Sequence, residues 1–230
     1  MYKGSPWTVM ERKFKFEEGE YYHIYNRGIE KRRIFLDQSD YGRFQNLLYL
    51  ANGTKAVVFK RVQGLPLDND RGPQHVDLLF YALMPNHFHI IAKENKMGGI
   101  SKFLSKISTS YSMYFNTKYE RSGALLCHPF RAQHLDTDDY FRWAITYIHL
   151  NPLDIHAPNW RENGVAVIQM ARNFLRDYKY SSYADYFAPA RRETKIIHKE
   201  NLPISMIELD DVEKMFACYT ELSKDYPWTN

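Results

Sequence analysis

VDLLFYALMPNHFHIIA, the stretch at residues 76–92, decides the fold of this chain. Two apolar segments flank Pro85-Asn86, a pair that favours a tight turn, so the stretch predicts two antiparallel strands joined by a short connection. Neighbouring side chains of a strand point to opposite faces of the sheet. His87 and His89 are therefore expected on one face, with Phe88 on the other.

The segments around this hairpin predict the rest of the fold. The expected elements are a strand at 21–27, a helix at 37–51, a helix at 100–119, a strand at 128–135 and a helix at 136–150 that stops before Pro152. The order strand, helix, strand, strand, helix, strand predicts an α+β fold: a ferredoxin-like (RRM-like) α/β sandwich with an antiparallel sheet, followed by an extra helix.

The length of 230 residues allows one substantial domain with additions. We predict an N-terminal arm at 1–13, a main domain at 14–160, and an extension at 161–230 that packs on the core and includes a short helix at 207–222. Residues 53–75 are rich in Gly, Pro, Asn and Asp, which predicts an inserted loop or short hairpin.

Composition narrows the class of protein. Hydrophobic residues make up 44% and charged residues 25%, as in ordinary soluble globular proteins. No apolar run is long enough to span a membrane, and residues 1–15 lack the apolar stretch of a secretory signal, so we expect a cytoplasmic protein without a membrane partner. Cys127 and Cys218 are too few for a disulfide framework or a thiolate zinc site. Any metal ligands are then imidazole or oxygen.

Charge and aromatic content suggest a nucleic-acid partner only weakly. The formal charge is +4, from 31 Lys and Arg against 27 Asp and Glu. Aromatic residues make up 16% of the chain and include 18 Tyr. Exposed rings beside basic side chains can stack on unpaired bases, although most of these rings are expected in the core.

The helix at 136–150 supplies a second candidate group. Tyr147 and Asn151 are four residues apart and so share one face of this helix. The residue pattern alone leaves ordinary interpretations open, because a helical Tyr commonly packs with its hydroxyl in water and Asn151 precedes a helix-stopping Pro152. A bare His-x-His pair is likewise more often a polar sheet surface than a metal site.

A family resemblance favours the functional interpretation. MPNHFHII at 84–91 resembles the signature of HUH single-tyrosine transposases, and of their REP-associated branch in particular. YHIYNRG at 22–28, YSMYFN at 111–116 and YIHLNP at 147–152 are similar to further family segments, in the family order. With YSSY at 180–183, the resemblance covers roughly residues 14–186.

The resemblance implies a function for each of these residues. His87 and His89 would bind a divalent ion, Mg²⁺ or Mn²⁺, with Asn151 as third ligand where many relatives carry Gln. Tyr147 would attack DNA, and the domain at 14–160 would be catalytic. His149 is a weaker candidate for DNA contact.

Such an enzyme would be a bacterial, nucleoid-associated transposase and single-strand endonuclease. It would cleave and rejoin single-stranded DNA at hairpin ends of an element through a 5′-phosphotyrosine, as a monomer or as a homodimer that exchanges helices. The candidate DNA-binding residues are basic: Arg27, Lys31, Arg32, Arg33, Lys102, Lys106, Lys118, Arg121 and Arg131.

Two other functions remain open at this point. Ferredoxin-like sheets with exposed aromatic residues also bind RNA, so the chain could be a noncatalytic or domesticated hairpin-binding protein. A zinc hydrolase that uses His87, His89 and His134 is disfavoured, because no acidic residue is evidently placed as its general base.

Overall fold

The computed structural model describes residues 15–56, 64–164, 168–202 and 211–226. The predicted N-terminal arm at 1–13 lies outside these ranges. Within them, no helix is both long and apolar enough to cross a membrane.

A four-stranded antiparallel sheet forms the centre of the molecule, with strand order β2-β3-β1-β4. The strands are β1 (Tyr21–Arg27), β2 (Val76–Met84), β3 (His87–Glu94) and β4 (Arg131–His134). Helices α1 (Gln38–Leu50) and α2 (Gly99–Lys118) complete the order strand, helix, strand, strand, helix, strand, and α3 (Asp138–Leu150) follows β4. The predicted α+β, ferredoxin-like class and its extra helix are confirmed.

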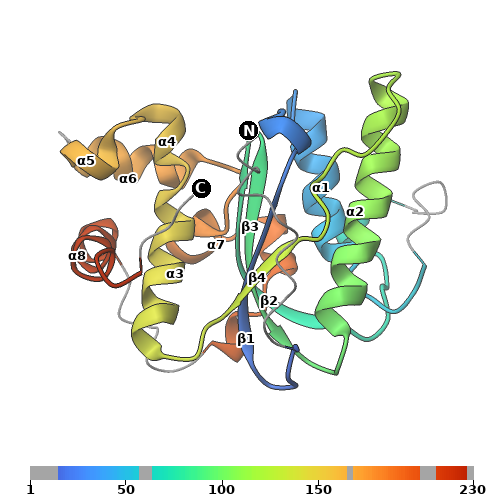
Figure 1. The fold of residues 1–230 in the computed structure, drawn as a ribbon, viewed down its shortest axis with the longest axis horizontal. Helices are drawn as coiled ribbons and strands as arrows, with labels where there is room; N and C mark the ends of the chain where they lie inside the picture. Colours follow the sequence, from blue (N-terminus) through green and yellow to red (C-terminus); the bar gives the residue numbers. More distant parts are fainter. Residues whose placement is uncertain (1–14, 57–63, 165–167, 203–210, 227–230) are drawn as a thin grey trace, which may run out of the picture.

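Helices cover both faces of the sheet. Figure 1 shows α1 and α2 on one side and α3 on the other, with α8 beyond α3. The other helices in the described part of the chain are η1 (Ile29–Lys31), η3 (Pro66–Asp68), α4 (Leu153–His156), α5 (Trp160–Asn163), α6 (Ile168–Asp177), α7 (Tyr183–Phe187), η4 (Arg192–Ile196), η5 (Lys199–Asn201) and α8 (Val212–Leu222). Residues 207–210 of the helix predicted at 207–222 lie outside the described ranges, as do 57–63 of the predicted insertion.

Local chemistry sets the ends of these elements. Asp37 caps α1 by accepting hydrogen bonds from the backbone N–H groups of Ser39 (2.8 Å) and Asp40 (3.1 Å). Thr137 caps α3 in the same way, so this helix starts later than position 136. Strand β4 begins later than predicted, at Arg131, because Pro129 has no N–H to donate to a ladder, and it ends at His134, one residue before the predicted end.

Alternation along β1 and β3 separates two apolar cores. Ile24 and Phe88 pack with Phe44 of α1 and Ile107 of α2 in the first core. The second core contains Ile91 of β3 with residues of β2, α3 and α8. The side chains that alternate with these core residues along β1 and β3 point to the opposite face and therefore face α3. The two histidines of β3 thus lie beneath that helix.

The C-terminal segment covers the outer edge of β2. The backbone N–H of Leu83 donates to Tyr180 O (2.9 Å), that of Ser182 to Tyr81 O (2.9 Å), and that of His198 to Leu78 O (2.8 Å). An edge strand left unpaired would offer a template for aggregation. Residues 180–198 therefore complete the sheet and contribute to the fold.

A buried ion pair holds this segment in place. The Asp185 carboxylate is fully buried and accepts hydrogen bonds from Arg191 Nε (2.7 Å), Arg191 Nη2 (2.7 Å) and Thr194 Oγ1 (3.0 Å). Arg191 also donates to Ser181 O (2.7 Å), next to the edge of β2. The pair thus joins two parts of the segment 180–198 to each other, and Arg191 joins this segment to the edge of the sheet.

Replacing Asp185 by Asn is expected to lower the free energy of unfolding by about 3–5 kcal/mol, because it leaves Arg191 partly buried without its counter-charge. Asp68→Asn is the matched control, since Asp68 pairs with Arg192 and Lys195 of the same segment but is exposed. Urea unfolding measures both. Equal effects of the two substitutions would contradict the importance of the buried pair.

Candidate active site beneath helix α3

The sheet face under α3 carries the predicted histidine pair. The β1–β3 register places Tyr25 opposite His89 and Arg27 opposite His87, so all four side chains share this face. The ring centres of His87 and His89 are 5.0 Å apart. Phe88, between them, packs in the opposite core. The predicted division of the strand into two faces is thus observed.

Helix α3 brings Tyr147 onto the same group. The ring centres of Tyr147 and His89 are 5.3 Å apart and nearly perpendicular, and Trp143 stacks on the other side of the phenol at 5.2 Å. Tyr147 is 1% exposed, as is His89. Residues distant in sequence therefore form one buried aromatic and imidazole cluster.

Asn151 ends α3 one turn after Tyr147. Its backbone N–H donates to Tyr147 O (3.0 Å), and its side chain is 1% exposed. The amide Oδ1 accepts a long hydrogen bond from Arg161 Nη2 (3.5 Å), and the buried Nδ2 has no hydrogen-bond partner among the described residues. A buried amide group with unused hydrogen-bonding capacity is suited to receive a further polar ligand.

Burial keeps the histidines of this face neutral. It lowers the pKa of His23 to about 3, and burial together with the nearby Arg161 and Arg27 lowers that of His87 to about 4. The pKa of His89 falls well below its ordinary value for the same reason, reinforced by its two histidine neighbours. Neutral imidazoles retain the lone pair that a metal ligand needs.

The donor set available to a metal is two imidazoles and one amide. Nδ1 of His87 contacts Asn86 Oδ1 at 2.7 Å, and its buried Nε2 has no hydrogen-bond partner in the described part of the chain. No three His, Cys, Asp or Glu side chains of the described residues are grouped so that they could hold a metal ion. A metal bound here would thus depend on Asn151 for its third protein ligand.

The structure separates His134 from this group. His134 pairs with Tyr22 in the sheet, stacks on its ring at 5.1 Å, and contacts Glu20 Oε2 at 2.8 Å. Because Tyr22 packs in the core on the other face, His134 does not face His87 and His89. The three histidines of a zinc hydrolase are therefore not brought together.

Two side chains of the cluster were not identified from the sequence. His23 of β1 contacts His89. The sequence could have indicated this, because His23 lies two residues before Tyr25 and four before Arg27 on a predicted strand and so shares their face. Arg161 of α5 lies with its Cζ 5.5 Å from the Tyr147 ring centre and forms an ion pair with Asp154. No local pattern predicts this second contact, which depends on the path of the chain after α3.

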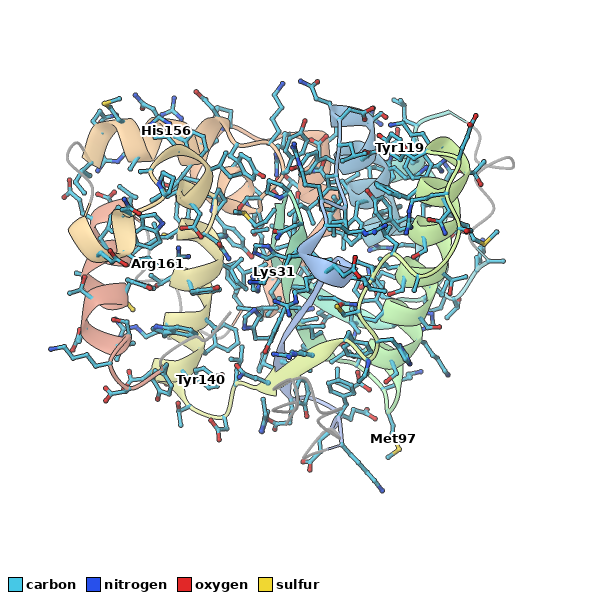
Figure 2. All side chains as sticks on the ribbon, turned by 45° about the horizontal axis from the view of Figure 1, so that its top comes forward. Lys31, Met97, Tyr119, Tyr140, His156 and Arg161 are labelled. Carbon is cyan, nitrogen blue, oxygen red and sulfur yellow. The ribbon has the colours of Figure 1, made fainter. Side chains whose placement is uncertain are left out.

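The candidate DNA-binding residues fall into two groups. Arg27 and Arg131 lie on β1 and β4, and Lys31, with Arg32 and Arg33 beside it, lies against the turn before His87, where Asn86 Nδ2 donates to Lys31 O (3.4 Å). Figure 2 shows Lys31 and Arg161 on the side turned to the viewer. Arg27 and Lys31 thus lie next to His87 and to the turn that precedes it.

The second group belongs to α2 and the residues after it, in the layer across the sheet from α3. Lys118 pairs with Asp37 (2.7 Å) and Asp40 (2.8 Å), Lys106 donates to Lys55 O (2.9 Å), and Arg121 donates to Asn116. Lys102 is exposed. Contact of either group with DNA stays a prediction. The ion pairs of Lys118 with Asp37 and Asp40 reduce the positive charge that it can present to a phosphate.

His149 is enclosed. It is completely buried, contacts Ser182 Oγ through Nε2 at 3.0 Å, and has a pKa lowered to about 3 by burial. In this conformation it cannot reach DNA, which argues against the weaker expectation for this residue.

No protein-family model and no curated protein matches the chain. Among solved structures, a REP-associated tyrosine transposase bound to a REP hairpin is 12% identical, covers 76% of this chain and 84% of its own, and has a TM-score of 0.47. A bacterial tRNA(His) guanylyltransferase-like protein in complex with ATP is 13% identical, covers 73% and 72%, and has a TM-score of 0.36. At these values neither structure carries an argument about function.

Acidification should destabilise the folded protein. His23, His87 and His149 have folded pKa values of about 3, 4 and 3 against an ordinary value of 6.5. Between about pH 6.5 and 4 the unfolded chain then binds more protons, so stability is full above this window and falls as the pH falls through it. Urea unfolding of metal-free protein at about pH 7 and about pH 5 measures the loss.

His149→Gln is the control, because it removes one of these groups without touching the sheet histidines. It should reduce the number of protons taken up on unfolding by about one. A stability that does not change across this window would contradict the burial of neutral imidazoles.

Proposed function

We propose that this chain is a metal-dependent enzyme that cleaves and rejoins single-stranded DNA through a covalent bond to Tyr147. One observation carries the proposal: His87, His89 and Tyr147 meet between β3 and α3, with the His89 and Tyr147 rings 5.3 Å apart. Phosphoryl transfer to tyrosine requires a phenol as the nucleophile and ligands for a metal ion beside it, and two imidazoles next to Tyr147 can serve as those ligands. The sequence resemblance to HUH single-tyrosine transposases supports the same reaction.

The proposed step exchanges one ester bond for another. The Tyr147 oxygen forms a bond to phosphorus while the bond from phosphorus to the 3′ oxygen breaks. The 3′ oxygen keeps the electron pair and takes up a proton, and the phenol proton passes to water. The products are a 5′-phosphotyrosine and a free 3′ hydroxyl, and attack by another 3′ hydroxyl reverses the exchange and reseals the strand.

The side chains around the phenol fit this role. A phenol is mostly protonated at neutral pH, because its ordinary pKa is about 10, so it needs help to react as an anion. The guanidinium of Arg161 lies 5.5 Å from the Tyr147 ring centre and favours negative charge there, although Asp154 offsets part of its effect. Arg161 is also placed to attract a phosphate.

His87, His89 and Asn151 are the proposed holders of the ion. The buried His87 Nε2 lacks a hydrogen-bond partner among the described residues and fits a metal ligand, and Asn151 would contribute its amide Oδ1, which accepts only a long hydrogen bond from Arg161 (3.5 Å). The unpartnered Asn151 Nδ2 is a donor and would suit a phosphate oxygen. When bound, Mg²⁺ or Mn²⁺ would polarise the phosphate and orient it for in-line attack.

Access requires a rearrangement. Tyr147 and His89 are each 1% exposed, so a phosphodiester enters only when neighbouring groups move aside. Arg161, a quarter exposed and joined to Asn151 and Asp154 by side-chain contacts, is one of the groups over the phenol. The proposed substrate is a single strand folded into a hairpin, held by the basic residues near the cluster, with the protein acting as a monomer or homodimer.

Tyr147→Phe should abolish covalent attachment of the protein, with Mn²⁺, to single-stranded oligonucleotides that carry palindromic ends from the flanking genomic DNA. Tyr140→Phe is the matched control, two turns earlier on the same helix, and should retain the adduct. A shifted band on a denaturing gel and mass mapping of the adduct measure this. An adduct on Tyr111 or Tyr114 would contradict the assignment, and hairpin binding without any adduct would favour the noncatalytic function.

His87→Ala should lose Mn²⁺ binding and strand cleavage but retain affinity for the hairpin, because the basic side chains and not the ion would hold the DNA. His156→Ala, an exposed substitution on α4, is the control and should change neither property. Metal binding, cleavage and hairpin affinity are measured separately on each protein. Unchanged cleavage by the His87 variant would overturn the assigned metal site.

A further inference from the structure

Strand β1 contributes a third histidine to the cluster. His23 Nε2 lies 2.9 Å from His89 Nδ1, and both side chains are buried, at 0% and 1% exposure. The two rings belong to neighbouring strands, with their centres 5.1 Å apart. His23 also lies on the Tyr147 side of the sheet, with 6.3 Å between the two ring centres.

This contact couples the protonation of the two rings. A neutral imidazole carries one N–H and one lone pair, so one of the two facing nitrogens donates and the other accepts. If His89 accepted at Nδ1, its proton would sit on Nε2 and block metal binding there. If His89 donates from Nδ1, its Nε2 holds the lone pair that a metal ligand needs.

We propose that His23 is a positioning residue that accepts a hydrogen bond from His89 Nδ1–H and thereby keeps His89 Nε2 available as a metal ligand. The inference rests on the proposed function, since it concerns the same site. It assigns to β1 the orienting role that a carboxylate or a backbone carbonyl has at most histidine metal sites.

The surroundings of His23 favour an accepting, neutral ring. Its neighbours on this face include the rings of Tyr25, His89 and Tyr147. His23 is fully buried, and out of water an imidazolium would be costly. Packing between these rings also fixes the plane of His23, so that its Nε2 is directed at His89.

Substitution at His23 tests this role without measuring cleavage. His23→Phe keeps a ring but removes the acceptor, and is expected to weaken Mn²⁺ binding about 10- to 100-fold, the usual effect of losing an outer-shell partner. His23→Gln offers an amide oxygen near the same position and should restore most of the affinity. Electron paramagnetic resonance of free Mn²⁺ measures binding, and circular dichroism with thermal melting confirms that each variant is folded.

Nitrogen-15 NMR of the unchanged protein provides a second test that does not depend on either variant folding. With Mg²⁺ present, His89 should carry its proton on Nδ1, and His23 Nε2 should be unprotonated. A proton on His89 Nε2, or Mn²⁺ affinity in folded His23→Phe equal to that of the unchanged protein, would overturn the inference.

The outcomes separate this inference from the proposed function. Mn²⁺ binding that depends on His23, in a protein that never forms a DNA adduct, would refute the enzyme and support the positioning role. A Tyr147 adduct with no effect of His23→Phe on Mn²⁺ affinity would support the enzyme and refute the positioning role of His23. Failure of the unchanged protein to bind Mn²⁺ would overturn both.

Discussion

The antiparallel pairing of β1 with β3 is the constraint on which the rest of the structure depends. Its register sets Tyr25 opposite His89 and Ile24 opposite Ile90. Apolar side chains of both strands enter the core under α1 and α2, whereas the histidines, Tyr25 and Arg27 face α3 together with Ile91. A shift by one residue would exchange the two faces. The packing of the core and the composition of the site are therefore fixed by the same hydrogen bonds.

Burial of this polar face shapes its chemistry. Removing imidazoles from water favours their neutral form, and neutral rings must find hydrogen-bond partners or another ligand. His23 and His89 satisfy part of this requirement with each other, and Asn86 satisfies part for His87. The positive charge of Arg161 at the border of the cluster lowers the pKa of both β3 histidines further. Under the proposed function, uncharged ligands would hold the cation and the arginine would attract the phosphate.

Periodicity and turn chemistry were sufficient to predict the sheet, its flanking helices and the shared face of His87 and His89, because these features depend on residues close in sequence. The meeting of Tyr147 with His89 was implied by resemblance and is seen in the geometry. An extension at 161–230 that packs on the core was predicted, but neither the contact of Arg161 with Tyr147 nor the course of residues 180–198 along the edge of β2 was, since both depend on how the chain returns after Pro152. The place of His134 on the opposite face was not predicted either, because it depends on the register in which β4 pairs with β1.

The central claim is that the imidazoles of β3 and the phenol of α3 enclose one metal ion and one phosphate. Anomalous scattering from crystals of the full chain grown with Mn²⁺ and a single-stranded hairpin tests it most directly. The account predicts one manganese peak in bonding contact with Nε2 of both His87 and His89, beside a phosphate that faces the Tyr147 oxygen. A manganese peak bound elsewhere, or DNA seated on another face of the molecule, would contradict it.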